Sequence, residues 1–272
     1  MQGRVLAIAG SDSGGGAGIQ ADVKTITALG AYAATAITAL TVQDTRAVYA
    51  VHRLPPSFIK AEIERALADP GADAVKIGML GDAETAAAVA TALRPVAGIP
   101  LVIDPVLLAS SGAKLLAEDA LDILRAELFP LATLITPNIP ETARLSGLAV
   151  CDQASMERAA RALRSGGGMG AVLVKGGHLS GETVVDVLAC AGGITRFEAP
   201  RLPGPPRHGT GCTLAAAIAA GLAQGLALLA AIQLARAYVR AAIATAPAIG
   251  AGAGPLNHAV TLDPGRIPPL GE

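Results

Sequence analysis

Short apolar runs alternate with longer amphipathic segments along most of the chain. Buried strands are continuous runs of Val, Ile, Leu and Ala, whereas helices that cover a sheet repeat apolar residues every three or four positions. The predicted strands are Arg4–Ala9, Ala34–Leu40, Ala74–Ile77, Leu101–Asp104, Thr133–Thr136 and Ala171–Lys175. The predicted helices are Ala17–Leu29, Ser57–Ala68, Asp82–Leu93, Glu118–Leu128, Glu141–Leu145 and Ser155–Arg164. The alternation predicts an α/β fold in which helices cover both faces of a mainly parallel sheet.

The pattern changes toward the end of the chain. Two closely spaced strands, Thr183–Leu188 and Ile194–Ala199, are expected to be antiparallel strands at one edge of the sheet. The long helices that follow are Gly211–Leu222 and Leu229–Ala246. Because no internal repeat and no linker interrupts the alternation, residues 1–260 are predicted to form one domain. Residues 261–272 are rich in Pro and Gly and are expected to be a loosely ordered tail.

The segment Thr213–Ala235 contains no charged residue and is long enough to raise the question of a membrane span. It is mostly Ala and Gly, it includes Gln224 and Gln233, and Gly225 can end one helix before another begins. We therefore predict two buried helices of a soluble protein that has no membrane partner.

Net charge and cysteine content limit the kinds of partner and the cellular compartment that we expect. The 272-residue chain has a formal net charge of −1 and no Lys- or Arg-rich run, so no nucleic-acid partner is expected. The N-terminal apolar run is too short for the core of a signal peptide. The three cysteines are far apart and form no CxxC pair, which argues against a disulfide framework or a zinc site. These features predict a cytoplasmic protein.

A glycine-rich stretch, GSDSGGGAGIQAD, follows the first predicted strand. It fits neither the dinucleotide-binding fingerprint nor the lysine-containing phosphate loop. Ligands of open α/β sheets bind beyond the carboxyl ends of the strands. The glycines therefore predict a backbone that closes over a ligand, and a flexible turn is the alternative.

Polar side chains also follow three other predicted strands: Asp104, then Asn138 with Glu141, then Lys175. Carboxylate and amide oxygens suit Mg²⁺, and a lysine pairs with phosphate oxygens. Each residue taken alone could be a solvated loop residue, and Asn138 could simply cap the helix that holds Glu141. Three such strand ends in succession predict a site for magnesium and phosphate.

The stretch HGTGC, residues 208–212, precedes a predicted helix. The first amides of a helix have no internal partner and, with the helix dipole, they bind anions. Cys212 lies in the first turn, where the pKa of a thiol tends to fall. Alternatively Cys212 is a small buried apolar residue, as Cys151 and Cys190 are expected to be. A Cys–His hydrolase built from Cys212 and His208 lacks an obvious third member.

The chain resembles a known family in seven stretches and in their order: GSDSGGGAGIQAD, TVQDT, KIGML, DPV, TPNIPE, KGGH and HGTGCTLAAAIAA. This is the family of hydroxymethylpyrimidine/phosphomethylpyrimidine kinases of thiamine biosynthesis, in the ribokinase-like superfamily, and GPLNH (254–258) resembles its C-terminal signature. The resemblance covers about residues 4–260. It implies a three-layer fold and a homodimer that uses ATP and Mg²⁺. Such an enzyme phosphorylates 4-amino-5-hydroxymethyl-2-methylpyrimidine and then its monophosphate.

The resemblance also implies roles for individual residues. Residues that would bind the aminopyrimidine are Gln43 and Asp22 by hydrogen bonds, with Gly10, Met79 and Val106 around the ring. Residues that would bind ATP phosphates are Lys175, Asn138 and Asp104, with Glu141 and Asp104 holding Mg²⁺ partly through water. Residues that would form the catalytic anion hole are Gly209, Thr210, Gly211 and Cys212.

Two positions differ from related patterns. Cys212 occupies a place where many sugar kinases of the superfamily carry an aspartate that acts as a general base. Either a thiolate that takes the proton or a neutral thiol that positions the alcohol is compatible with the sequence, because loose phosphoryl transfer needs little base assistance. Arg207 replaces the threonine that usually precedes the HGTGC histidine.

Two other functions remain compatible with these residues. A vitamin B6 kinase acts on pyridoxal or pyridoxine, whose ring is also flat and carries a hydroxymethyl arm. A non-catalytic pyrimidine-binding protein would keep the fold without turnover, although every polar group that the chemistry requires is present.

Overall fold

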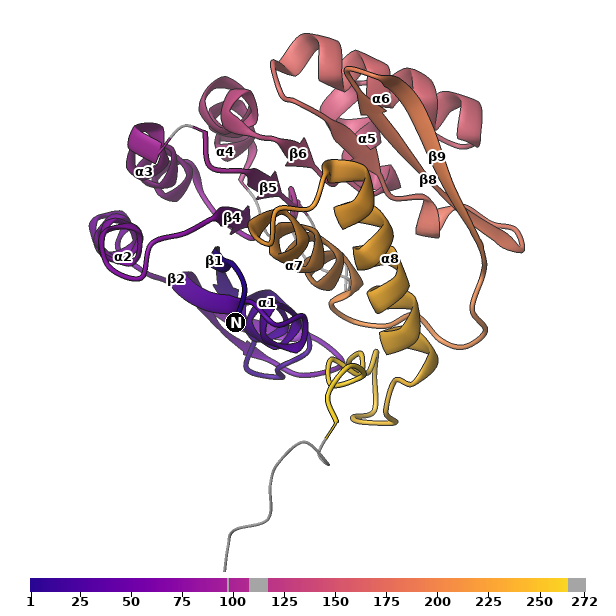
Figure 1. Ribbon diagram of the computed structural model, residues 1–272, viewed down its shortest axis with the longest axis horizontal. Coiled ribbons are helices and arrows are strands. Elements are labelled where there is room, and N and C mark those ends of the chain that lie inside the picture. The colour runs from indigo at the N-terminus through magenta and orange to yellow at the C-terminus, as the bar shows by residue number, and fades with distance from the viewer. Residues whose placement is uncertain (97, 108–116, 264–272) are drawn as a thin grey trace, which may run out of the picture.

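A computed structural model of the protein describes residues 1–96, 98–107 and 117–263 (Figure 1). Within these residues, nine strands form one sheet in the order β3-β2-β1-β4-β5-β6-β7-β8-β9. The strands are β1 Arg4–Ser11, β2 Tyr32–Gln43, β3 Val48–Arg53, β4 Ala74–Ile77, β5 Leu101–Ile103, β6 Leu134–Ile135, β7 Val172–Val174, β8 Thr183–Cys190 and β9 Gly193–Pro200. Strands β2, β1, β4, β5, β6 and β7 are parallel, and β3, β8 and β9 are antiparallel. The predicted mixed sheet with antiparallel edge strands is confirmed.

Helices cover both faces of the sheet, as the alternation predicts. One apolar cluster joins the sheet to α1 (Gly18–Ala28), α7 (Thr210–Ala223) and α8 (Leu228–Ala244). The other cluster joins the opposite face to α2 (Pro56–Ala68), α3 (Ala83–Leu93), α4 (Glu118–Ile123), α5 (Ile139–Ser146) and α6 (Gln153–Gly167). In Figure 1 the first group lies inside the arc of strands and the second group outside it.

The uncharged segment Thr213–Ala235 forms α7 and the start of α8, as predicted. The two helices lie close together because their facing side chains are small: a Cβ atom added at Gly221 would lie 3.1 Å from the Cβ atom of Ala231. Gly225, with a φ of +84°, lies in the turn between them. Among the described residues, no helix is long and apolar enough to cross a membrane.

The structure departs from the predicted elements at β3 and at α4. Strand β3 was not predicted, because VYAVHR is almost wholly exposed at the edge of the sheet and shows no buried face. The helix predicted over Glu118–Leu128 is α-helical only to Ile123, widens to a π-helical turn over Leu124–Leu128, and ends in a 3₁₀ turn that contains Pro130. Proline has no amide hydrogen, so regular α-helical bonding cannot continue through it. Residues 264–272 of the predicted tail lie outside the described residues.

The order of the strands identifies the crevice in which a ligand would bind. From β1 the chain passes through α1 to β2 on one side, and it later returns to β4 on the other side of β1. Where successive connections leave a central strand in opposite directions, the carboxyl ends of the two neighbouring strands separate and leave a crevice. The crevice here lies between the ends of β1 and β4.

Candidate active site

Gly10 and Met79 lie at this crevice. Gly10 is near the end of β1, and a Cβ atom added to it would lie 3.3 Å from the sulfur of Met79, which follows β4. The Thr38 hydroxyl donates to the Met79 carbonyl oxygen at 2.7 Å and so holds the loop after β4. Val106 follows β5, the next strand in the sheet. The three residues expected to surround a ring therefore lie at the ends of three adjacent strands.

Asp22 and Lys76 form a buried ion pair between α1 and β4. Both side chains are fully buried, and Lys76 Nζ lies 2.7 Å from Asp22 Oδ2. Asp22 Oδ1 has no hydrogen-bond partner among the described residues. Burial raises the pKa of Asp22 to about 6, against the opposing effect of the Lys76 charge. No role was predicted for Lys76, although a lysine inside the apolar strand AVKI was a signal that the interior contains a charge.

Asp104 and Lys175 come together from β5 and β7. Lys175 Nζ lies 2.6 Å from Asp104 Oδ1, which also accepts the Thr136 hydroxyl at 3.0 Å. A Cβ atom added at Gly211 would lie 3.0 Å from both Asp104 Oδ2 and Lys175 Nζ. The ends of the central strands therefore meet the first turn of α7, which lies on a segment distant in the sequence.

Asn138 and Glu141 form a capping box at the start of α5. The Asn138 side-chain oxygen accepts the Glu141 amide at 2.9 Å, and Glu141 Oε2 accepts the Asn138 amide at 2.8 Å. The alternative interpretation of Asn138 as a helix cap is thus correct. Burial raises the pKa of Glu141 to about 7, Lys175 opposes this shift and Asp104 adds to it. Asp104 and Glu141 thus share the single positive charge of Lys175, and a further cation would stabilise both carboxylates.

The start of α7 offers unpaired backbone donors. Gly209 caps the helix with a φ of +84°, and a Cβ atom there would overlap the Gly16 carbonyl oxygen. The amides of Thr210, Gly211 and Cys212 have no acceptor among the described residues. These amides and the positive end of the helix dipole can bind an anion beside Asp104 and Lys175.

The Cys212 thiol is neutral near pH 7. The expectation that its position in the first turn lowers its pKa is wrong, because burial raises the pKa to about 11. The Lys76 charge opposes this shift, while Asp22 and Asp104 add to it. The helix terminus lowers the pKa of the thiol by less than burial and the two nearby acids raise it.

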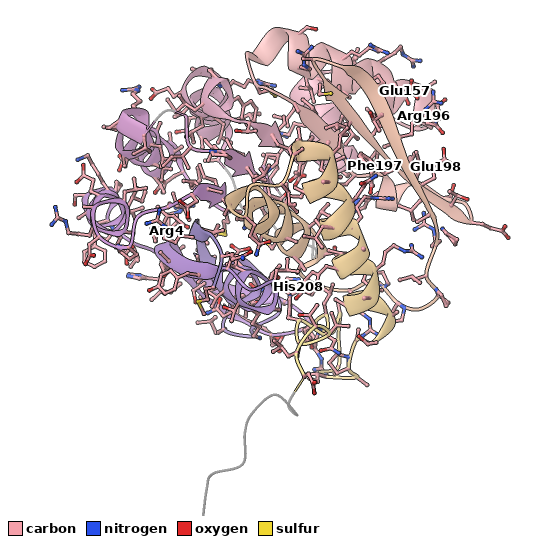
Figure 2. All side chains as sticks on the ribbon, viewed as in Figure 1. Arg4, Glu157, Arg196, Phe197, Glu198 and His208 are labelled. Atoms are coloured by element: carbon pink, nitrogen blue, oxygen red, sulfur yellow. The ribbon has the colours of Figure 1, made fainter. Side chains whose placement is uncertain are left out.

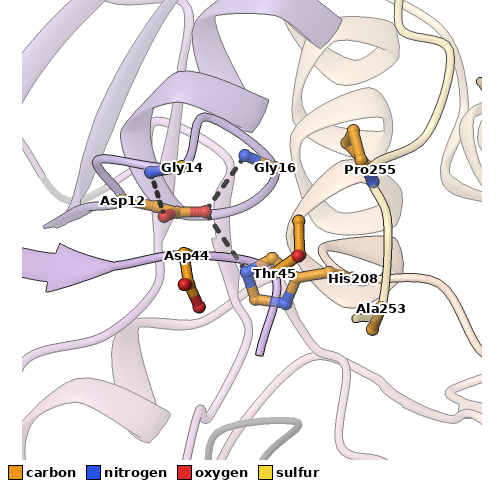
Figure 3. Close-up of a pocket in the computed structure, with 8 residues that line it drawn as sticks. All are labelled: Asp12, Gly14, Gly16, Asp44, Thr45, His208, Ala253 and Pro255. Atoms are coloured by element: carbon orange, nitrogen blue, oxygen red, sulfur yellow. Dashed lines mark hydrogen bonds and ion pairs between the residues drawn. The ribbon is translucent and has the colours of Figure 1, made fainter. Parts of the chain in front are cut away.

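His208, which is labelled in Figure 2, joins three segments of the site. Its Nε2 atom lies 3.2 Å from Asp12 Oδ2, a contact that Figure 3 shows, and 2.8 Å from the end of the Gln43 amide. His208 thus bonds Asp12 and Gln43, which leaves no support for the Cys–His hydrolase. A small pocket beside it is lined by Asp12, Gly14, Gly16, Asp44, Thr45, His208, Ala253 and Pro255. No role was predicted for Asp12, although it is one of the two acidic residues in the glycine-rich stretch.

Arg207 faces the C-terminal segment. Its guanidinium group lies 3.5 Å from the Pro247 carbonyl oxygen, so the arginine that replaces the usual threonine contacts the backbone of that segment. The GPLNH stretch also contacts α7, because His258 Nε2 lies 3.0 Å from the Thr213 hydroxyl oxygen. That hydroxyl donates to the Gly209 carbonyl at 2.8 Å. Burial lowers the pKa of His258 to about 4, so this histidine is neutral near pH 7.

Comparisons with known proteins identify the family of the chain. A family model described as phosphomethylpyrimidine kinase matches residues 12–257. The thiamine biosynthesis bifunctional protein ThiED of Geobacter sulfurreducens is 47% identical over 96% of this chain, which spans only 53% of that longer protein. The hydroxymethylpyrimidine/phosphomethylpyrimidine kinase of Rhizobium meliloti is 48% identical over 93% of this chain and 96% of its own length.

Solved structures show the same fold. The ADP complex of Bacillus subtilis pyridoxal kinase has a TM-score of 0.88 at 33% identity, over 96% of this chain and 98% of the other. The phosphomethylpyrimidine kinase of Clostridium difficile has a TM-score of 0.77 at 39% identity, over 87% of this chain and 97% of the other. The predicted ribokinase-like fold and the predicted phosphotransferase activity are confirmed. The chain belongs to the phosphomethylpyrimidine kinase family, with the activity of a hydroxymethylpyrimidine/phosphomethylpyrimidine kinase of thiamine biosynthesis.

Proposed function

We propose that this chain transfers the terminal phosphoryl group of ATP to the hydroxymethyl group of 4-amino-5-hydroxymethyl-2-methylpyrimidine. A second transfer converts the resulting monophosphate to the diphosphate. The observation that carries this proposal is the set of unpaired amides at Thr210, Gly211 and Cys212 beside the Asp104–Lys175 pair. Phosphoryl transfer spreads negative charge over the peripheral oxygens, and preorganised amides and a lysine stabilise that charge.

The aminopyrimidine would bind in the crevice between β1 and β4. Gly10 leaves room beside Met79, whose adaptable side chain provides an apolar face, and Val106 follows on the next strand. The unpartnered Asp22 Oδ1 can accept a hydrogen bond from the exocyclic amine. An amine that takes this bond relieves a buried carboxylate oxygen that otherwise has no partner, so the pocket favours a ring that carries a donor.

Asp104 and Glu141 fit a magnesium ion. Magnesium binds through one or two carboxylates together with phosphate oxygens and water. Burial, with the charge of Asp104 beside it, raises the pKa of Glu141, and a bound cation would favour the ionised carboxylate. Bound Mg²⁺ would neutralise charge on the ATP phosphates. Lys175 would contact the same phosphates, and the amide nitrogen of Asn138 could donate to them while its oxygen caps α5.

Cys212 would position the reacting alcohol through its neutral thiol. A thiol with a pKa of about 11 is a poor base at pH 7, and a loose transition state needs little base assistance. The catalytic contribution of this site then comes from the amides of Thr210, Gly211 and Cys212 and from the Lys175 charge.

Product analysis tests this function. The protein is incubated with Mg-ATP and the pyrimidine alcohol, and the products are separated by mass. We expect the monophosphate and then the diphosphate, and binding without turnover would instead support a non-catalytic pyrimidine-binding protein. Parallel reactions with pyridoxal test the second candidate, which is favoured by the structural similarity to a pyridoxal kinase. Faster turnover of pyridoxal than of the pyrimidine alcohol would favour a pyridoxal kinase over a pyrimidine kinase.

We also propose a homodimer in the cytoplasm. Strands β2 and β3 expose apolar side chains at one edge of the sheet, which supports a dimer interface there. These residues are Leu40, Val42, Tyr49 and Val51. The three cysteines are free, as is usual in a reducing compartment. Light scattering during gel filtration should give twice the chain mass of 27.0 kDa, and a single-chain mass would rule out the dimer.

A further inference from the structure

Asp12 is an ionised acceptor at the centre of the glycine-rich loop. Its Oδ1 accepts the Gly14 amide at 2.8 Å, and its Oδ2 accepts the amides of Gly16 at 3.0 Å and Ala17 at 2.8 Å. Burial raises the pKa of Asp12, but the hydrogen bonds from His208 and from the backbone lower it, and the net shift is downward. Asp12 therefore has no proton to donate to the histidine ring.

This fixes the proton on His208. Nε2 of the ring lies 3.2 Å from Asp12 Oδ2. An unprotonated Nε2 would turn its lone pair toward the carboxylate, which would repel it. Nε2 therefore carries the hydrogen and is a donor, both in the neutral ring and in the imidazolium ion.

The proton on His208 in turn fixes the Gln43 amide. The amide atom that faces His208 Nε2, at 2.8 Å, is placed as nitrogen, but a nitrogen cannot accept from a protonated Nε2. Since the two ends of an amide have the same shape, the hydrogen-bond network decides the assignment, and here it requires the oxygen, which shares the single Nε2 hydrogen with Asp12 Oδ2. The NH₂ group then faces the Thr41 hydroxyl oxygen at 3.4 Å. That hydroxyl donates to the Ser11 carbonyl at 2.9 Å, so its lone pairs are left to accept.

We propose that Asp12 and His208 are positioning residues for substrate selection, which hold the oxygen of Gln43 and turn its NH₂ group toward the pocket. This inference rests on the proposed function. The NH₂ end of the amide lies beside Thr41, whose hydroxyl donates to the carbonyl of Ser11, the residue that follows Gly10 in the chain. There it offers a donor to a ring nitrogen, while the Asp22 carboxylate accepts from the neighbouring amine. A free amide could turn its oxygen to the ring nitrogen, and the two lone pairs would repel.

His208 suits this task because its ring is held on several sides. Its backbone amide donates to the Gly254 carbonyl at 3.1 Å, and a Cβ atom added at Gly16 would lie 3.0 Å from the ring carbon Cδ2. The backbone of His208 is thus fixed to the C-terminal segment, and one side of its ring lies against the glycine-rich loop.

The first experiment observes the proton and does not depend on turnover. In protein labelled with ¹⁵N-histidine, the Nε2 resonance of His208 is assigned by its loss in His208→Gln and is recorded near pH 7.5. We expect a protonated Nε2, and an unprotonated Nε2 would overturn the inference. If the resonance shows a protonated Nε2 but the wild-type protein phosphorylates neither alcohol, the proposed function fails while the hydrogen-bond assignment stands.

The second experiment compares His208→Leu with His208→Gln, whose amide nitrogen reaches the position of Nε2 and keeps a donor there. In His208→Leu we expect KM for the pyrimidine alcohol to rise about tenfold, as the loss of an oriented hydrogen bond would produce, with KM for ATP and kcat changed less than about twofold. In His208→Gln most of the rise should disappear. An unchanged KM for the alcohol, an equal rise in both KM values, or equal defects in the two variants would each contradict the proposal. If His208→Leu does not fold, Gln43→Glu gives the same test, because it keeps an acceptor for His208 but removes the donor.

Discussion

The buried pair of Lys76 and Asp22 gives the sharpest test of how charge is held inside this fold. In Lys76→Met the new side chain keeps much of the volume, so the main change is the loss of the charge opposite Asp22. Removing one partner of a buried ion pair costs about 3–5 kcal/mol of stability, because the other charge is left uncompensated. Both side chains are fully buried and 2.7 Å apart, so we expect a loss of this size at pH 8.

The loss should depend on pH, and its sign follows from Asp22. The pKa of Asp22 is already about 6 with Lys76 present, and without that charge it rises further. The folded variant then keeps the carboxyl protonated, whereas the unfolded chain ionises it at about pH 3.9. Stability therefore falls as pH rises, by about 1.4 kcal/mol per pH unit, or up to about 4 kcal/mol between pH 5 and pH 8.

Urea unfolding followed by circular dichroism at pH 5, 6, 7 and 8 measures this effect. Adding Asp22→Asn to the variant should recover about 2 kcal/mol at pH 8, because an amide is neutral at every pH and the folded protein no longer has to keep a carboxyl protonated. Lys60→Met is the matched control: Lys60 pairs with Glu64 on the surface of α2, where such a pair contributes about 0.5 kcal/mol or less. If Lys76→Met loses no more stability than Lys60→Met, or shows the pH dependence of the wild type, the assignment of a buried charge pair is wrong.

Two further predictions concern the start of α7. Gly209→Ala should lower stability by about 1–3 kcal/mol, because the backbone at residue 209 is left-handed. It should also lower kcat about a hundredfold, because the new Cβ displaces the Gly16 carbonyl and misplaces the anion-binding amides. Gly225→Ala is its control, since Gly225 has the same φ of +84° but open space around it, so only stability should change in urea unfolding and steady-state rates. Cys212 should react with iodoacetamide at pH 8 at least about tenfold more slowly than exposed Cys151, since the pKa of Cys212 is about 11. Mass spectrometry of the peptides measures the labelling of each cysteine, and faster labelling of Cys212 would show that it is a thiolate.

The parts of the site that were predictable from the sequence lie at the ends of parallel strands. Asp104, Asn138 and Lys175 each follow an apolar run, and parallel strands bring such positions to one edge of a sheet. Strand β3 was not predictable in this way, because an exposed edge strand has no buried face to create a pattern.

The contacts that were missed join residues far apart in the chain. Lys76 and Asp22 are 54 positions apart, and His208 and Asp12 are 196 apart. Neither local spacing nor helical periodicity relates such positions. The pKa of Cys212 could not be predicted from the sequence either. The rule that a helix terminus lowers the pKa of a thiol depends on local sequence, whereas burial and the charges of Asp22 and Asp104 depend on the folded molecule.

The contacts of the GPLNH stretch have a consequence for synthesis of the protein. His258 bonds Thr213 in the anion-binding helix, and the backbone of His208 pairs with Gly254 and Pro255. A nascent chain still on the ribosome can build the sheet from its early strands, but it lacks these late residues. The phosphate site of each new molecule is thus completed only after residues 254–258 have emerged, and a prematurely terminated product ending before residue 254 would carry an unsupported loop in place of a working kinase.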